Sequence, residues 1–208
     1  MKKYIILVAC SILMSSCGVF VNKTYKYAND VTKDKFRPME INLENIDKDF
    51  LSEYDSAITF YRIDANIIKN IVLNSNEKYV LFVSFYGFCE YSSNYFDSVY
   101  IYAEQNNLPI FVIDNTDWLY QDRTRSFLRS KGYNYHVYAM DINKYGNQFH
   151  CRKRWRKFIS ELCSDRNTEL WGYNDIILFS QKGDILLYGD FIEERDKLNN
   201  ILNRMAQK

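Results

Sequence analysis

Glycine, proline and histidine are scarce in this chain, with 7 Gly, 2 Pro and 2 His among 208 residues. Collagen-like and linker-like sequences need many glycines or prolines, and disordered chains lack bulky apolar side chains, so these classes are excluded. No charge of one sign predominates, because 27 Lys and Arg face 26 Asp and Glu. We therefore expect no nucleic-acid partner. Aromatic residues are abundant, with 18 Tyr and 14 Phe, and the length suits one compact domain.

The first residues have the pattern of an export signal. Lys2 and Lys3 form a short basic start, and residues 4–14 carry no charge. This apolar stretch suits a signal peptide and is too short to cross a bilayer as a helix. Residues 13–18 read LMSSCG, with two small residues before Cys17, and this pattern resembles the lipobox of bacterial lipoproteins.

The resemblance to a lipobox implies cleavage before Cys17 and acyl groups on that residue. Two or more acyl chains would hold the protein on a membrane of the bacterial cell envelope. The alternatives are an ordinary secretory signal with an incidental cysteine and an uncleaved amphipathic start. Residues 18–24 lack the acidic cluster that resembles surface-export signals, which favours a periplasm-facing anchor.

We expect three parts along the chain. Residues 1–16 are the predicted signal peptide, and residues 17–45 are an acylated tether without sustained periodicity. Residues 46–208 are the predicted domain.

Hydrophobic patterning in the domain alternates between helix and strand. Apolar residues at helical spacing predict helices over residues 63–73, 92–105, 118–130, 146–164 and 191–205. Continuous apolar runs predict strands over residues 79–85, 108–113 and 136–140, and a hairpin over 175–188 that turns at Gly183. This alternation predicts an α/β fold with a largely parallel sheet, helices on both faces and antiparallel edge strands from the hairpin.

The order of these elements looks like the thioredoxin fold in its TlpA-like form, over about residues 60–206. Residues 85–92 read FYGFCEYS, which is similar to the family's strand-to-helix turn with two cysteines. Cys89 falls on the nucleophilic cysteine, Phe88 on the usual tryptophan, and Ser92 on the resolving cysteine. Residues 172–179 read GYNDIILF, where Asn174 falls on the cis-proline. The resemblance thus implies a mixed central sheet and a degenerate active site.

The resemblance also implies which residues would surround Cys89. These candidate binding residues are Phe88, Tyr91, Ser92, Tyr173 and Asn174. A serine hydroxyl cannot attack a mixed disulfide, so ordinary dithiol turnover is excluded at this motif. A cis peptide before a residue other than proline is costly, so we expect the Tyr173–Asn174 bond to be trans.

The cysteines leave two interpretations open. Cys89 would sit at the start of a helix, which favours a thiolate and hence a monothiol nucleophile, but the preferred interpretation is a leftover or packing cysteine. Cys151 could serve as a displaced resolving thiol or be a buried free thiol. Cys151 and Cys163 fall in one predicted helix, too far apart by helical rise to pair with each other.

The remaining candidates are weaker. His136 and His150 have no further ligands at suitable spacing, so we expect no metal and no cofactor. The basic run at residues 152–157 either contacts anionic headgroups or an acidic partner, or is a solvated face with Trp155 and Phe158 turned to the core. Several tyrosines either form a binding surface or fill the core and its rim, namely Tyr91, Tyr95, Tyr100, Tyr102 and Tyr120.

Three functions are consistent with these patterns. The first is a membrane-anchored thioredoxin-like lipoprotein that binds or scaffolds partners without dithiol chemistry. The second is a monothiol thiol-disulfide oxidoreductase that uses Cys89 against exported proteins or small-molecule disulfides. The third is a lipoprotein that captures a target through its basic helix.

Overall fold

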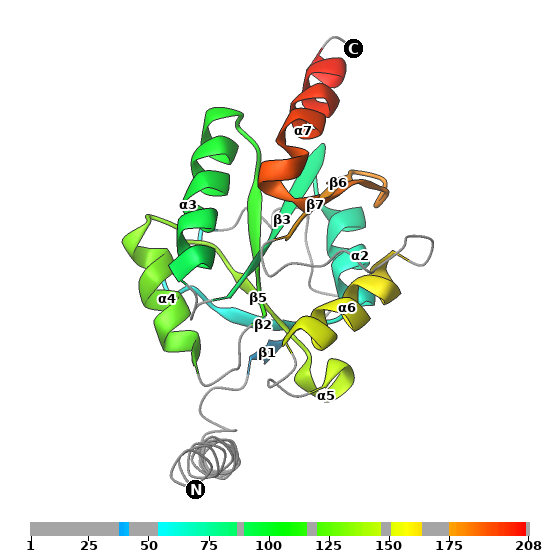
Figure 1. Ribbon diagram of the computed structural model, residues 1–208. Helices are drawn as coiled ribbons and strands as arrows, with labels where there is room; N and C mark the ends of the chain where they lie inside the picture. Colours follow the sequence, from blue (N-terminus) through cyan, green and yellow to red (C-terminus); the bar gives the residue numbers. More distant parts are fainter. Residues whose placement is uncertain are drawn as a thin grey trace, which may run out of the picture. The chain divides into compact units, whose positions relative to one another are not determined.

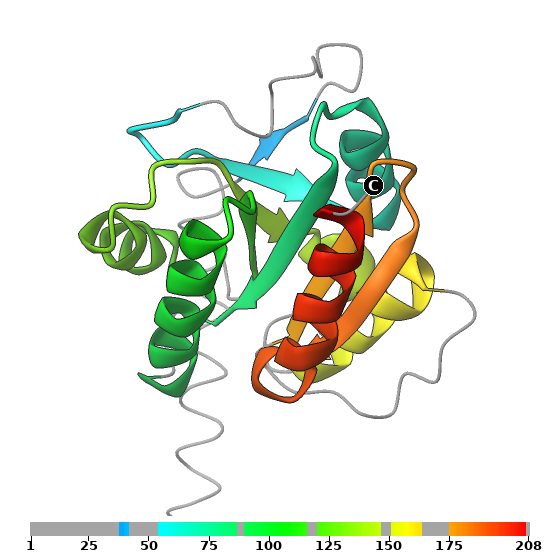
Figure 2. The same cartoon turned by 90° about the horizontal axis from the view of Figure 1, so that it is seen from above.

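A mixed seven-stranded sheet with helices on both faces forms the domain (Figures 1 and 2). The computed structural model describes residues 38–41, 54–86, 90–115, 120–146, 151–163 and 175–206. The strands are β1 (Met39–Glu40), β2 (Phe60–Ile63), β3 (Tyr79–Phe85), β4 (Ile110–Asp114), β5 (Val137–Met140), β6 (Asp175–Ser180) and β7 (Ile185–Asp190). The helices are α2 (Ala65–Asn74), α3 (Glu90–Gln105), α4 (Gln121–Ser130), α5 (Ile142–Tyr145), α6 (Cys151–Leu162) and α7 (Phe191–Ala206).

The strands lie in the order β1-β2-β5-β4-β3-β6-β7. Strands β1 to β5 are parallel where they pair, and β6 and β7 continue the sheet antiparallel to β3. The chain moves from β3 through β4 to β5 in one direction across the sheet, and from β2 to β3 in the other. Because parallel crossovers are right-handed, α3 and α4 cover one face and α2 the other. The expected α/β class, mixed sheet and final hairpin with its helix are confirmed.

The central strand β3 has the bounds that its apolar run predicts. Six of its seven residues are buried, as expected for a strand covered on both faces. Phe82 contacts Phe111 and Phe179 on the face covered by α2, α5 and α6. Phe85 points to the opposite face, where its ring meets Phe96 of α3 and Phe127 of α4. The side chains of one strand therefore join both helical layers to the sheet.

The prediction of one helix over residues 63–73 is wrong at its start. Ile63 is the last residue of the strand β2, and the helix begins at Ala65. The Asp64 carboxylate accepts a hydrogen bond from the Ile67 amide at 2.9 Å and so caps α2. The strand was missed because its two middle residues are only half-buried, which interrupts a continuous apolar run.

The predicted helix over residues 146–164 also starts too early. Gly146 ends the short helix α5 with a φ of 101°, a left-handed conformation that glycine adopts without strain. Helix α6 begins at Cys151 and ends at Leu162, so Cys163 lies just beyond it. The hairpin prediction is confirmed, including a positive φ of 80° at Gly183.

Two further findings concern the amino-terminal parts. Met39 and Glu40, which fall within the stretch predicted as a tether, pair with Tyr61 and Arg62 of β2. Among the residues that the structure describes, no helix combines the length and the apolar character needed to cross a bilayer.

Candidate functional site

The carboxyl ends of β2, β5, β4 and β3 meet at one edge of the sheet, which we call the carboxyl edge. Strand β6 begins at this same edge, because it runs antiparallel to β3. Loops at the carboxyl ends of parallel strands are the usual place for ligand sites in α/β proteins. The predicted turn with Cys89 follows β3, and the predicted loop with Asn174 precedes β6. The topology therefore places the two predicted parts of the site, the turn with Cys89 and the loop with Asn174, next to the ends of neighbouring strands.

Several predicted site residues lie outside the described residues. These are Cys17, Phe88, Cys89, Tyr173 and Asn174. The backbones of Tyr91 and Cys151 belong to α3 and α6, but their side chains are likewise not described. The roles assigned to these residues remain predictions.

Ser92 is the predicted site residue whose side chain the structure places. It lies in the first turn of α3 and is 1% exposed. Its hydroxyl oxygen accepts a hydrogen bond from the Tyr86 amide at 3.0 Å. Tyr86 directly follows β3, so this bond closes the turn between the strand and the helix. Where the resemblance implies a resolving thiol, the chain has a buried hydroxyl that holds the turn.

The end of β4 is held to both β3 and α6. The Asn115 amide donates to the carbonyl of Phe85 at 2.9 Å. Arg154 of α6 donates from Nε to the Asn115 side-chain oxygen at 3.2 Å and from a second nitrogen to the Asn115 carbonyl. Arg154 is 1% exposed, so a positive charge is buried at the carboxyl edge.

The start of β6 carries a buried carboxylate. Asp175 is 2% exposed, and its Oδ2 accepts hydrogen bonds from Trp155 Nε1 and the Tyr188 hydroxyl, each at 2.7 Å. Its amide donates to the Ser84 hydroxyl oxygen at 2.9 Å. Burial raises the pKa of the Asp175 carboxyl to about 6, although the bonds from Tyr188 and Trp155 favour the charged form. Asp175 therefore titrates far closer to neutrality than an ordinary aspartate.

Helix α6 reaches both sides of β3 through two consecutive residues. Arg154 contacts Asn115 after β4, and Trp155 contacts Asp175 at the start of β6. Strands β4 and β6 are the two neighbours of β3 in the sheet. These two residues of α6 therefore contact the chain on either side of the end of β3.

This placement corrects the interpretation of the basic run. Arg154 is not on a solvated face, since it is buried against β4. Lys153, Arg156 and Lys157 are exposed, and Trp155 turns to the core as predicted. Phe158 is also buried and stacks on Trp155 at a centroid distance of 5.4 Å.

Two of the tyrosines proposed for a binding surface belong to the core instead. Tyr95 and Tyr102 are each 4% exposed. The Tyr95 hydroxyl accepts a hydrogen bond from the Phe191 amide at 2.8 Å, and the Tyr102 hydroxyl donates to Asn199 at 2.6 Å. Both residues hold α7 against α3. Tyr100 is half-buried and Tyr120 exposed, so only these two of the described tyrosines in that set reach the surface.

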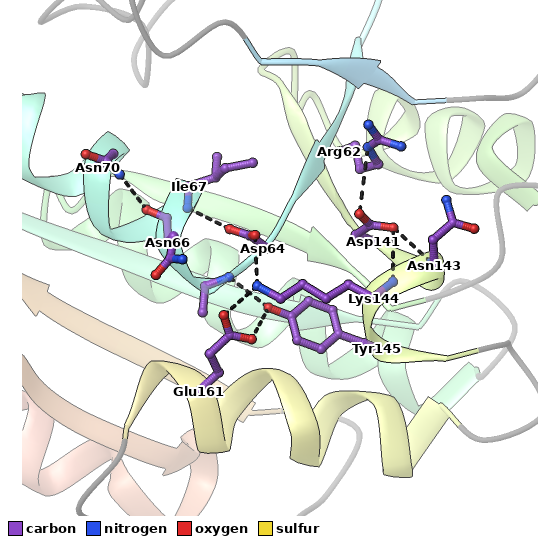
Figure 3. Close-up of polar contacts among 11 residues, drawn as sticks. Arg62, Asp64, Asn66, Ile67, Asn70, Asp141, Asn143, Lys144, Tyr145 and Glu161 are labelled. Atoms are coloured by element: carbon purple, nitrogen blue, oxygen red, sulfur yellow. Dashed lines mark hydrogen bonds and ion pairs between the residues drawn. The ribbon is translucent and has the colours of Figure 1, made fainter.

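A second polar cluster lies at the β2 and β5 end of the carboxyl edge (Figure 3). Lys144 of α5 contacts Asp64 at 2.9 Å and Glu161 of α6 at 2.5 Å. The Tyr145 hydroxyl donates to Glu161 at 2.8 Å and accepts from the Ala65 amide at 3.0 Å. Burial disfavours the charge of Lys144, but the bonds to Glu161 and Asp64 outweigh it and raise its pKa.

The bonds of this cluster join α2, α5 and α6, and each of its acids already has a cationic or hydroxyl partner. Its arrangement is that of a structural clamp. Across the described residues, no group of three or more His, Cys, Asp or Glu is arranged to hold a metal ion. His136 instead contacts the Asp55 carboxylate through Nδ1 at 3.0 Å.

Sequence reasoning missed Ser84, Asn115 and Asp175 as parts of the carboxyl edge. Each is a polar residue at or near the end of a buried apolar strand, where a polar side chain needs a partner. Their position at the end of an apolar run was the sequence feature from which a role at the carboxyl edge could have been predicted. The contact between Arg154 and Asn115 could not be found in this way, because it depends on the angle at which α6 crosses the sheet.

Comparisons with known proteins find similarity only at the level of structure. No family profile and no curated protein matches the chain. A secreted Mycobacterium tuberculosis disulfide oxidoreductase homologous to E. coli DsbE is similar with 10% identity and a TM-score of 0.33, over 54% of this chain and 69% of that one. The thioredoxin domain of a Bacteroides vulgatus thiol-disulfide oxidoreductase has 18% identity and a TM-score of 0.34, over 62% and 79%. TM-scores this low carry no argument about the activity of this chain.

The topology itself matches the resemblance stated from the sequence. Strand β3 leads through α3 to the parallel neighbour β4, and β6 and β7 continue the sheet antiparallel on the other side before α7 closes the chain. The additional strand β5 lies between β4 and β2. The segments β3–α3–β4 and β6–β7–α7 thus follow the order expected from the resemblance to the thioredoxin fold, and β5 is an insertion in that order.

Proposed function

We propose that this chain is a membrane-anchored, thioredoxin-like envelope lipoprotein that binds or scaffolds partners and performs no dithiol turnover. Its anchor would be acyl groups on Cys17, facing the periplasm. Its binding surface would be the carboxyl edge around the Cys89 turn, and exported proteins are the class of partner that this location offers.

The hydrogen bond from the Tyr86 amide to Ser92 carries this proposal. Dithiol exchange needs a second thiol that attacks the mixed disulfide formed by the first. At the position that the resemblance assigns to that thiol, a buried hydroxyl accepts a hydrogen bond from the turn. The side chain at this position therefore has a structural role that requires no sulfur.

The test is reduction of insulin disulfides by the full chain with dithiothreitol as the electron source. We expect the wild type to be no faster than dithiothreitol alone. The variant Ser92→Cys restores the pair of cysteines separated by two residues, and any gain in rate should disappear when Cys89→Ser is added. Ser98→Cys places a thiol on the same helix, at an exposed position, and serves as the matched control. Robust turnover by the wild type would disprove the proposal.

A monothiol oxidoreductase is the second candidate. Cys89 directly precedes Glu90, the first residue of the 16-residue helix α3. Amide groups and the dipole at the start of a helix stabilise a thiolate, which is the reactive form of cysteine. This candidate predicts a mixed disulfide with an exported protein that is trapped by rapid alkylation and absent in Cys89→Ser. If trapping yields no adduct in the wild type, the second candidate is rejected.

A further inference from the structure

The outward side of α6 carries three exposed cations. Lys153, Arg156 and Lys157 lie at a spacing of three and four residues, which places them on one side of the helix within an arc of about 100°. Exposed Ser160 continues the same side one turn later. The opposite side of α6 packs into the core through residues such as Trp155.

These three cations have no carboxylate partner within the described residues. The ion pairs there involve other lysines and arginines. Helix α6 contains one acid, Glu161, and its two oxygens are bonded to Lys144 and Tyr145. The charge on the outward side of α6 is therefore not neutralised by its own helix.

The neighbouring helix α2 adds no negative charge. It packs against α6 on the same face of the sheet, and its sequence ANIIKNIVLN contains one lysine and no acid (Figure 2). Lys69 is half-buried, and the apolar side chain of Leu73 is 56% exposed. We define the basic face by the three exposed cations of α6, namely Lys153, Arg156 and Lys157.

The helices on the other face of the sheet contain acids, some of which pair with cations. There Asp122 of α4 pairs with Arg125, and Glu194 of α7 pairs with Lys197. Lys131, which follows α4, pairs with Asp97 of α3. Among the described residues, the three outward cations of α6 thus have no carboxylate partner, and acids lie beside the cations in the helices of the other face.

We propose that the basic face binds the surface of an anionic phospholipid bilayer. This inference rests on the proposed lipoprotein anchor, because acyl groups would keep the domain beside the headgroups. Each lysine or arginine close to an anionic bilayer strengthens binding about fivefold, and these cations break no ion pair in doing so. Long basic side chains also reach headgroups while their stems cover apolar surface. An acidic protein would suit the charge alone, but the predicted anchor favours the lipid.

The test measures how the full chain partitions onto sedimented vesicles of phosphatidylcholine, with and without phosphatidylglycerol. Every arm carries Cys17→Ser, so that acyl chains do not dominate binding. The test variant combines Lys153→Gln, Arg156→Gln and Lys157→Gln. Its preference for anionic over neutral vesicles should fall by about 100-fold relative to the parent, since three cations are removed. High salt should abolish the preference of the parent.

A matched control loses the same charge from the other face of the sheet, through Arg123→Gln, Arg195→Gln and Arg204→Gln, all at exposed positions. Its preference should stay within about threefold of the parent. Equal losses in both variants, or none in the test variant, would overturn the inference. Capture by polyglutamate that depends on the basic face, with unchanged vesicle binding, would also overturn it in favour of an acidic protein. The proposed anchor is tested separately. A wild-type chain that carries no added acyl mass on Cys17 would show that the anchor is absent.

Discussion

Two buried serine hydroxyls accept backbone hydrogen bonds beside the end of β3. Ser84 accepts from the Asp175 amide, and Ser92 accepts from the Tyr86 amide. Both oxygens act on backbone groups that lie outside the regular ladders of the sheet. At the scale of single residues, the carboxyl edge is thus ordered by polar side chains that appear in the sequence as isolated interruptions of apolar runs.

Ser92→Ala should lower the free energy of unfolding by about 1–2 kcal/mol, because it removes a buried acceptor of a backbone amide. Urea unfolding of the full chain measures the change. Ser98→Ala removes an exposed hydroxyl from the same helix and should stay within about 0.5 kcal/mol of the wild type. Equal stability of Ser92→Ala and the wild type would contradict the structural role of this hydroxyl.

Asp175 should give the protein a distinctive dependence of stability on pH. Its carboxyl has a pKa of about 6 in the folded chain, against an ordinary value of 3.8. Between these two values the folded state binds more protons than the unfolded state, so stability falls as the pH rises through this window and is constant above it. The loss is on the order of 3 kcal/mol at most.

Urea unfolding between pH 4 and pH 7, a range of about three units around these pKa values, tests this dependence. Asp175→Asn removes the titrating group and should flatten the decline relative to the wild type. Asp196→Asn, at an exposed position of α7, should leave the decline unchanged. A decline that persists in Asp175→Asn would show that another group causes it.

At the scale of elements, the success of the sequence predictions follows the burial of each segment. Strand β3 and the hairpin strands were predicted almost to the residue because continuous apolar runs leave few alternatives. Strand β2 was missed because only its first and last residues are buried. The start of α6 was misplaced because Gly146, which ends α5, was included in the predicted helix. Local hydrophobic patterns therefore predict buried segments well, but they predict the boundary between two successive helices poorly.

The candidate site was predictable to a similar extent. The turn after β3 and the loop before β6 meet at one edge because β6 lies beside β3 and runs antiparallel to it, and the resemblance to the thioredoxin fold implied that these two segments lie together. The contacts of Arg154 and Trp155 with Asn115 and Asp175 were not predictable, since they are non-local. They depend on how α6 lies across three strands, which no window of sequence contains.

Tyr145→Phe tests whether the polar cluster joins α2, α5 and α6. The change removes a hydroxyl that donates to Glu161 and accepts from the Ala65 amide. We expect a loss of about 1–3 kcal/mol in unfolding free energy. Hydrogen exchange at the Ala65 amide should also accelerate more than exchange within β3. Tyr120→Phe, which alters an exposed ring, should change neither quantity. Unaltered exchange at Ala65 would argue against the clamp.

At the scale of the whole molecule, the candidate site and the exposed cations of α6 lie on different parts of the surface. The carboxyl edge gathers the predicted Cys89 turn, buried Asp175 and buried Arg154. The basic face lies on the outer side of α6, one helical layer away from the sheet. Under the proposed anchoring, the chain would bind lipid through the basic face and a partner through the carboxyl edge.

The most direct test of a scaffold without dithiol chemistry is to count free thiols in the exported full chain by mass-shift alkylation before and after reduction. After export, Cys89, Cys151 and Cys163 are the thiols expected to remain. We predict that all three are alkylated without prior reduction in the wild type, and that the two remaining thiols are alkylated in Cys89→Ser and in Cys151→Ser. A disulfide that disappears in both Cys89→Ser and Cys151→Ser would contradict the proposal and identify a redox pair at the carboxyl edge.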